Sequence, residues 1–417
     1  MNKINFETFT LENGLKVIVH EDHSIPFAVV DVLYRVGSKD EQEHRTGFAH
    51  LFEHLMFEGS KHIPSYDKPL QRVGGQNNAF TTADITNYYL SLPSNQLETG
   101  FWLESDRMLE LAFSQEKLDI QKSVVIEEYK QRYLNQPYGD AHLKLRGLHF
   151  EKHPYRWPTI GKDISHVEEA TLEEVKDFFF SFYAPNNATL VVAGDVKMDQ
   201  VKDLAQKWFG PIPFRNLKKR ELPLEPPQKT GKSMTVSGEV PYPAVYKMYH
   251  VPAHTERGYY ISDIITDLLS NGKSALLFQD MVKTKKLSPQ VNAYSWGMHH
   301  PGIISIDGRL AEGVSIEAYE KGLNESLAKI QELTEEDLSR IKGKLEASFV
   351  MQQTRLLNKT MTLAISDSLG DPDLINTTPQ IYEGISLEEV KKMAVEILAA
   401  HNCSTLYYLP KAHVQHT

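Results

Sequence analysis

A proline-rich, charged break at residues 215–232 constrains the fold of this chain more than any other feature of its sequence. It holds three prolines and the basic run Lys218-Lys219-Arg220 among few apolar residues. Segments of this composition are typical of linkers between domains. The flanking parts, residues 1–214 and 233–417, are each about as long as one ordinary domain. We therefore predict two domains joined by a linker.

Both parts present their expected strands and helices in a similar order. In the first part, Asn13-Gly14 is a strong hairpin signal between two alternating segments, and an apolar strand follows at residues 28–34. In the second part, an expected strand at 244–250 precedes a helix at 258–269. Hairpins grouped with helices favour an α+β class, with helices on one face of a mainly antiparallel sheet. We expect two similar domains of this kind and interpret them as a distant duplication.

The charge balance and the apolar pattern exclude several kinds of partner. The net charge is −10, and nucleic-acid binding rests on clustered Lys and Arg, so nucleic acid is not the expected partner. No run of about 18 apolar residues is present, so no membrane span is expected. The first residues lack the apolar segment of a signal peptide. We expect a cytoplasmic protein, or a periplasmic one if a signal peptide has been removed.

His50, Glu53 and His54 form the motif that carries the chemistry. They lie in residues 48–57, a stretch without Pro or Gly that predicts a helix. Positions i, i+3 and i+4 share one helix face, so both imidazoles can reach one metal ion at about 2.0–2.1 Å. The Glu53 carboxylate would then lie beside the metal's open position, where it can take a proton from a water. A catalytic zinc site needs three protein ligands, so a third is expected elsewhere.

An ordinary explanation of this motif has to be weighed against the metal site. Such a string arises by chance, and 17 histidines in the chain raise that chance. Most lone histidines are surface or hydrogen-bonded core residues. The flanking residues favour the metal site, because Phe48, Leu51 and Leu55 are apolar. Polar groups inside such a helix are costly unless something satisfies them.

The segment from Gly47 to Ser60, GFAHLFEHLMFEGS, resembles a family signature. The family is that of pitrilysin, insulin-degrading enzyme and mitochondrial processing peptidase, the inverzincin zinc metallopeptidases. Residues 11–17, 77–81 and 183–190 resemble its opening hairpin, its substrate-binding edge strand and the end of its first domain. The resemblance is specific in the first part of the chain and loose in the second. It implies two similar α+β domains, one zinc ion per chain, and peptide hydrolysis in a chamber built from four such domains.

The resemblance also implies a third zinc ligand on a downstream helix. Glu127 and Glu128 both stand there, and adjacent helical residues point about 100° apart, so only one should face the metal. Glu128 matches the family's ligand position and Glu127 is its rival. A solvated helix face is the ordinary explanation for both. Many family members carry a glutamate seven residues before this ligand; here Gln121 stands there, which hydrogen-bonds but has no charge.

The second part of the chain departs from the family in a substrate-binding pair. Single-chain active members carry an Arg and a Tyr seven residues apart, and the matching positions here are Lys283 and Gln290. Lys supplies charge without the planar fork of Arg, and Gln can still donate a hydrogen bond. A solvated basic loop is the alternative explanation. Because members that lose this pair often work beside a metal-free homologous subunit that supplies it, we expect a dimer with this chain as the zinc-bearing subunit.

Together these features predict a zinc-dependent endopeptidase with His50, His54 and Glu128 as ligands and Glu53 as general base. The resemblance implies that the peptide adds as a strand along the sheet edge at Asn78, Ala79 and Phe80. One alternative is an inactive scaffold subunit of the same family, in which the motif ligands are typically lost. Another is a structural zinc site, which uses four protein ligands, commonly including Cys. The single cysteine, Cys403, does not lie near the motif.

Overall fold

The computed structural model describes residues 3–217 and 221–411, so the basic run of the predicted linker lies outside the described residues. The chain forms two compact units. The first comprises Met1–Tyr129, Trp157–Leu222 and Ser348–Thr378, and the second comprises Lys130–Arg156, Pro223–Ala347 and Pro379–Thr417. Both units are α+β, as predicted. These units differ from the predicted domains, 1–214 and 233–417, in two segments. Residues 130–156 of the first half belong to the second unit, and residues 348–378 of the second half belong to the first unit.

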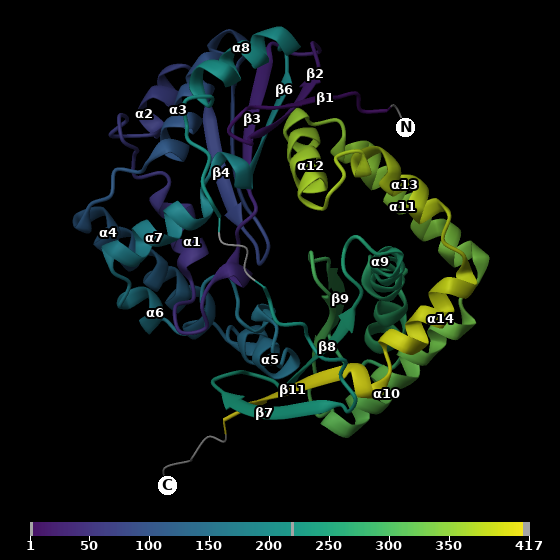
Figure 1. Cartoon of the computed structure of the whole chain (residues 1–417). Coiled ribbons are helices and arrows are strands. Elements are labelled where there is room, and N and C mark those ends of the chain that lie inside the picture. Colours follow the sequence, from purple (N-terminus) through teal and green to yellow (C-terminus); the bar gives the residue numbers. More distant parts are fainter. Residues whose placement is uncertain (1–2, 218–220, 412–417) are drawn as a thin grey trace. The chain divides into compact units, whose positions relative to one another are not determined.

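A six-stranded sheet forms the centre of the first unit, with the order β1-β2-β6-β3-β5-β4 (Figure 1). The β2–β6 pair is parallel, and the other neighbouring strands are antiparallel. The predicted hairpin at Asn13-Gly14 is confirmed, and Gly14 adopts a φ of +86° that this turn requires. The strands are β1 (Glu7–Thr10), β2 (Lys16–Glu21), β3 (Phe27–Tyr34), β4 (Gln76–Thr81), β5 (Thr86–Pro93) and β6 (Ala188–Gly194).

Helices cover both faces of this sheet, so the expectation of helices on one face only was wrong (Figure 1). The helix on the second face comes from the other half of the sequence. On one face, α3 (Leu97–Leu109) approaches so closely that a Cβ on Gly100 would lie 3.0–3.2 Å from Leu90, Leu92 and Val30. On the other face, α12 (Leu356–Ser368) adds Leu363 and Ala364 to a core with Ile18, Leu33 and Val191. The remaining helices of this unit are α1 (Phe48–Leu55), α2 (Asp67–Arg72), α4 (Gln115–Tyr129), α6 (Ser165–Glu168), α7 (Leu172–Phe182) and α8 (Met198–Trp208).

A buried carboxylate on α12 attaches this late segment to the first sheet. The Asp367 side chain is 2% exposed. Arg35 Nη2 and Thr189 Oγ1 each donate to its Oδ2 at 2.6 Å, and Lys16 pairs with its Oδ1. A residue from the second half of the sequence thus pairs with two cations, Lys16 and Arg35, of the first half.

The second unit repeats this plan on a five-stranded sheet of order β7-β11-β8-β10-β9. Ser295 donates to Asp263 of α9, whereas its neighbour Tyr294 hydrogen-bonds His142 of α5. Adjacent strand residues point to opposite faces, so α9 and α5 cover opposite faces of this sheet. The elements are α5 (Ala141–His149), β7 (Lys232–Gly238), β8 (Ala244–Val251), α9 (Arg257–Ser270), β9 (Gln290–Trp296), β10 (Gly302–Arg309), α10 (Ile316–Ala328), α14 (Leu387–Ile397) and β11 (Cys403–Pro410).

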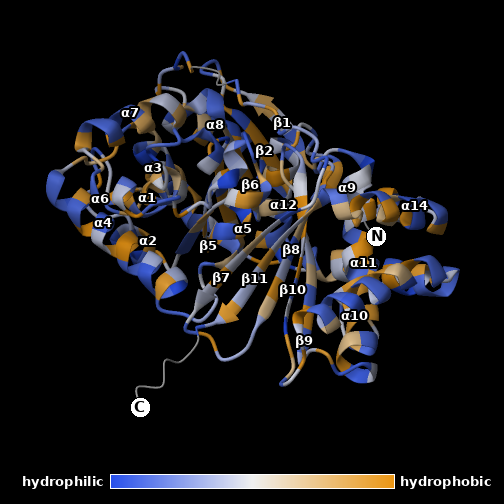
Figure 2. Cartoon of the chain, turned by 90° about the horizontal axis from the view of Figure 1, so that it is seen from below, coloured by the Kyte–Doolittle hydropathy of each residue, from blue (hydrophilic) through white to orange (hydrophobic). Residues whose placement is uncertain are grey.

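Two further helices, α11 (Glu335–Gln352) and α13 (Leu374–Glu383), each contain one of the points where the chain passes from one unit to the other. Figure 2 shows that the helices carry a mixture of apolar and polar residues along their length. This pattern is the one expected of helices that each bury one side. None of the helices in the described ranges is long and apolar enough to cross a membrane.

A stacked histidine pair holds α5 against the second sheet. The rings of His149 on α5 and His250 on β8 lie 3.7 Å apart between centroids, and Ser404 Oγ lies 3.0 Å from His149 Nδ1. Burial lowers the pKa of His149 well below its usual value and that of His250 to about 4. Lys232 adds to both shifts, while Glu225 opposes the shift at His250.

We expect this pair to make the second unit sensitive to acid. In the unfolded chain these histidines bind protons near pH 6.5, whereas in the folded chain the pKa of His250 is about 4 and that of His149 lies well below its usual value, so stability is lost as the pH falls below about 6.5. Each histidine contributes up to about 1.4 kcal/mol per pH unit. Urea unfolding followed from pH 7.5 to 4.5 should show this loss, and His250→Leu should flatten it. The exposed His401→Gln serves as control; an equal slope in His250→Leu and wild type would contradict the expectation.

Candidate active site

Helix α1 carries the motif and is fixed at its start by a glycine. Gly47 has a φ of +91°, and a Cβ there would lie 2.8 Å from the Ile160 carbonyl oxygen, so a side chain does not fit. Further along the helix, the ring of Phe52 stacks at 5.1 Å on Phe178 and at 5.2 Å on Tyr183. This apolar side anchors α1 to α7. The polar residues of the motif are left on the other side of the helix.

The structure brings His50, His54 and Glu128 together as one group. One ligand atom from each lies within 4.8 Å of the other two. The Glu128 Oε2 atom, on α4, lies 3.2 Å from His50 Nε2 and 3.5 Å from His54 Nε2. Glu53 Oε2 lies 3.5 Å from His50 Nδ1. Among the residues that the structure describes, no other group of three such side chains has this geometry.

These distances fit a tetrahedral zinc site. Two ligands that each lie about 2.0–2.1 Å from zinc at a tetrahedral angle are about 3.4 Å apart. The two distances from Glu128 Oε2, 3.2 and 3.5 Å, bracket this value. Two imidazoles and one carboxylate are also a donor set that catalytic zinc sites use. The group can therefore hold a zinc ion and leave a fourth position for water or substrate.

The titration of the group reflects its mutual contacts. Burial lowers the pKa of His50, but hydrogen bonds with Glu128 and Glu53 outweigh burial and raise it to about 9. Burial and the neighbouring His50 lower the pKa of His54. Burial raises the pKa of Glu53, but the hydrogen bond with His50 contributes to a net lowering. Glu53 is therefore ionised at neutral pH, as a group that accepts a proton must be.

The two rival glutamates differ in their surroundings. Glu128 is half-buried in the group, whereas Glu127 is exposed. Gln121 lies on the same helix, seven residues before Glu128. Its side chain donates a hydrogen bond to Glu58 and also contacts His54. Gln121 therefore lies beside one of the zinc-ligand candidates, and its supporting role stays a prediction.

The predicted substrate-binding residues lie on an open sheet edge. Asn78, Ala79 and Phe80 belong to β4, the last strand in the order of the first sheet, and β4 lies next to α1. Asn78 is exposed, whereas Phe80 packs partly against the core beneath α12. The described strands pair with β4 on one side only, at β5. Its other edge can therefore take an additional strand.

Lys283 and Gln290 belong to the second unit. Both are exposed. Lys283 lies in a π-helical turn at Phe278–Thr284, with its Nζ 5.6 Å from the centre of the Phe278 ring. Gln290 begins β9 and donates to Asn292 Oδ1 at 3.1 Å. Neither of these two contacts is a buried ion pair.

One buried residue beside α1 has no counterpart in the sequence analysis. Glu41 is 2% exposed, and its carboxylate accepts hydrogen bonds from the backbone amides of Gly47 and Ala49. Burial raises its pKa to about 8, and the two amides act in the opposite direction. An acidic residue six positions before Gly47 gives no periodic or motif signal, so sequence reasoning missed it.

Comparison with known proteins places the chain in a family. Residues 16–146 match the model described as insulinase (peptidase family M16), and residues 169–345 match the peptidase M16 inactive domain. The chain is 30% identical to the zinc protease PqqE of Helicobacter pylori over 354 residues, which cover 82% of this chain and 79% of that protein. The chain belongs to peptidase family M16.

Other M16 relatives agree with this assignment. The uncharacterized zinc protease YmxG of Bacillus subtilis is 23% identical over 394 residues, or 93% of this chain and 95% of that protein. The crystal structure of a protease from Helicobacter pylori superimposes with a TM-score of 0.92 at 27% identity, covering 98% of this chain and all of that one. The predicted resemblance is thus confirmed, and so are the two-domain α+β fold and the membership in a family of proteases.

Proposed function

We propose that this chain is a zinc-dependent endopeptidase. The observation that carries the proposal is the convergence of His50, His54 and Glu128 within 4.8 Å beside Glu53. The names of the M16 relatives, zinc proteases, support the same reading. The scaffold alternative is weaker, because all four motif side chains are present and suitably placed.

The chain's own residues supply each part of the reaction except the metal. Bound to His50, His54 and Glu128, a zinc ion supplies a Lewis acid that polarises a scissile carbonyl and lowers the pKa of water. Glu53 takes the proton of the attacking water on its carboxylate and later gives it to the leaving amine. The open edge of β4 holds the peptide through main-chain hydrogen bonds, which give little side-chain specificity.

The choice between the two glutamates has a direct test. We expect Glu128→Gln to weaken zinc binding by at least about 100-fold, because an amide is a poorer metal ligand than a carboxylate. Glu127→Gln changes an exposed neighbour on the same helix and should leave the affinity as in wild type. Both are measured by competition with a chelator of known zinc affinity. If Glu127→Gln were the variant that loses zinc, the proposed ligand set would be wrong.

We further propose that the chain works as the zinc-bearing subunit of a dimer. The support is that Lys283 and Gln290 stand where single-chain family members are expected to carry Arg and Tyr, and that both are exposed. Peptidase activity and zinc content of the purified chain, with its oligomeric state, test this step. Zinc-loaded chain without activity would point to a metal-free homologue as the missing partner. Full activity of the chain alone would contradict an obligatory partner.

A further inference from the structure

The connector between β3 and α1 runs directly against the hairpin that joins β4 to β5. A Cβ on Gly37 would lie 2.5 Å from the carbonyl oxygens of Thr82 and Ala83. The backbone amide of Ser38 donates to the Thr82 oxygen at 3.2 Å, and that of Lys39 donates to the Ala83 oxygen at 2.9 Å. The connector is thus hydrogen-bonded to the turn that follows β4.

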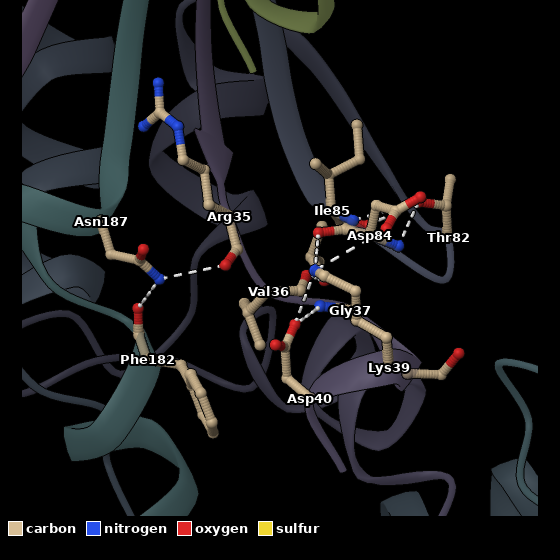
Figure 3. Close-up of polar contacts among 12 residues, drawn as sticks. Arg35, Val36, Gly37, Lys39, Asp40, Thr82, Asp84, Ile85, Phe182 and Asn187 are labelled. Carbon is tan, nitrogen blue, oxygen red and sulfur yellow. Dashed lines mark hydrogen bonds and ion pairs between the residues drawn. The ribbon is translucent and has the colours of Figure 1, made fainter. Parts of the chain in front are cut away.

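Charged side chains strengthen this attachment (Figure 3). Lys39 Nζ donates to the Asp84 carbonyl oxygen and to Asp40 Oδ2, both at 2.9 Å. The same Asp40 oxygen accepts from the Gly37 amide at 3.0 Å. The Lys39 side chain is only 11% exposed. The connector therefore has a well-defined position relative to the β4–β5 hairpin.

The next residue of the connector, Glu41, reaches forward to α1. Its Oε2 accepts from the Gly47 amide at 3.0 Å, and its Oε1 accepts from the Ala49 amide at 2.8 Å. Amides at a helix start have no partner inside the helix, and a carboxylate is the favoured partner for them. The zinc-ligand candidate His50 follows Ala49 directly. The first turn of α1 is thereby attached to a connector that is itself attached to the β4–β5 hairpin.

We infer that Glu41 is a positioning residue that fixes His50 and His54 relative to the substrate-binding strand β4. The inference rests on the proposed function, because it concerns the same metal group and the same strand. The two hydrogen bonds described above join Glu41 to the start of α1 and not to the ligand atoms of the metal group. It acts through the helix start, where a shift of about 1 Å at a reacting group is enough to cost about 100-fold in rate.

The test uses Glu41→Gln in the full chain. The amide keeps the size of the side chain but offers one acceptor oxygen to two N–H donors, so one amide of α1 is released. We expect the dissociation constant for zinc to rise about tenfold and kcat to fall about tenfold to 100-fold, with KM within about twofold of wild type. The absorption spectrum of the cobalt(II)-substituted chain should change, because it reports ligand geometry directly.

Two controls separate positioning from stability. Glu43→Gln changes a glutamate of the same connector whose side chain is 53% exposed and pairs with Lys162; it should behave as wild type. Ser386→Ala removes the cap of α14 in the second unit, which lowers stability without touching α1. It should keep the wild-type cobalt spectrum. If Glu41→Gln does not fold, Glu41→Asp, which cannot reach both amides, takes its place.

The outcomes separate this inference from the proposed function. Wild-type metal affinity and cobalt spectrum in Glu41→Gln, with only a lower unfolding midpoint, would show a merely structural role and overturn the inference alone. A wild-type chain that binds no zinc would overturn both. Changed affinity and spectrum in Glu41→Gln, with both controls unchanged, would support the inference even if the chain needs a partner for activity.

Discussion

A Glu53→Gln chain is expected to bind zinc as wild type does and to lose peptidase activity by a factor of about 10²–10⁴, the usual contribution of a general acid–base group. The amide keeps the size of the side chain but cannot take up the proton of the attacking water. The carboxylate lies 3.5 Å from His50 Nδ1, and the His50 contact contributes to holding its pKa below the usual value. Glu53 is therefore available as a base at neutral pH.

The measurement is hydrolysis of a mixed peptide pool, together with zinc per chain, in whichever assembly shows activity. Glu127→Gln is the matched control, because it makes the same chemical change at an exposed position one residue from the proposed ligand Glu128. Loss of zinc along with activity would mean that Glu53 contributes to binding the metal. Unchanged activity in Glu53→Gln would contradict the proposed role of Glu53 as general base.

Replacing Asp367 by Ala is expected to destabilise the first unit, because it removes a buried carboxylate from α12. The change leaves Arg35 and Lys16 without their acidic partner at a buried position, and breaking such a pair typically costs about 3–5 kcal/mol. The side chains of Arg35 and Lys16 are 34% and 36% exposed, so water can compensate part of this loss. We therefore expect a loss of about 2–4 kcal/mol in the free energy of unfolding.

Urea unfolding at neutral pH measures this loss. Glu396→Ala, which changes an exposed acid on α14, is the control and should change the midpoint little. A double variant in which Arg35 is also replaced should lose less than the sum of the single changes, because the two residues share one interaction. Additive losses would contradict the direct pairing.

Local patterns in the sequence predicted the elements that depend on their own residues. The Asn13-Gly14 hairpin and the helix at His50 are both confirmed. In each case the signal is a turn residue or a run without Pro and Gly within a few positions. The choice of Glu128 over Glu127 came from the family resemblance, since periodicity alone leaves both open.

The features that sequence reasoning missed depend on distant partners. The sequence analysis did not predict that α11 ends at Gln352, or that α12, which follows the extended residue Arg355, packs on the first sheet. No Pro or Gly marks that break; the partner surface lies more than 300 residues earlier, as the Arg35–Asp367 bond shows. The capping role of Glu41 was missed for the same reason, because its burial is set by the packing around α1.

Because α5 belongs to the second unit and α12 to the first, neither unit can finish folding until much of the other half of the chain has been synthesised. The helices of the motif leave the exit tunnel early, but the face of the first sheet that receives α12 stays uncovered until residue 368 has been made. At about 5–20 residues per second, that interval lasts roughly ten seconds or more. During it Leu33 and Val191, which are fully buried in the finished unit, lack their cover. The newly made first half therefore exposes an apolar sheet face to solvent until α12 is available to cover it.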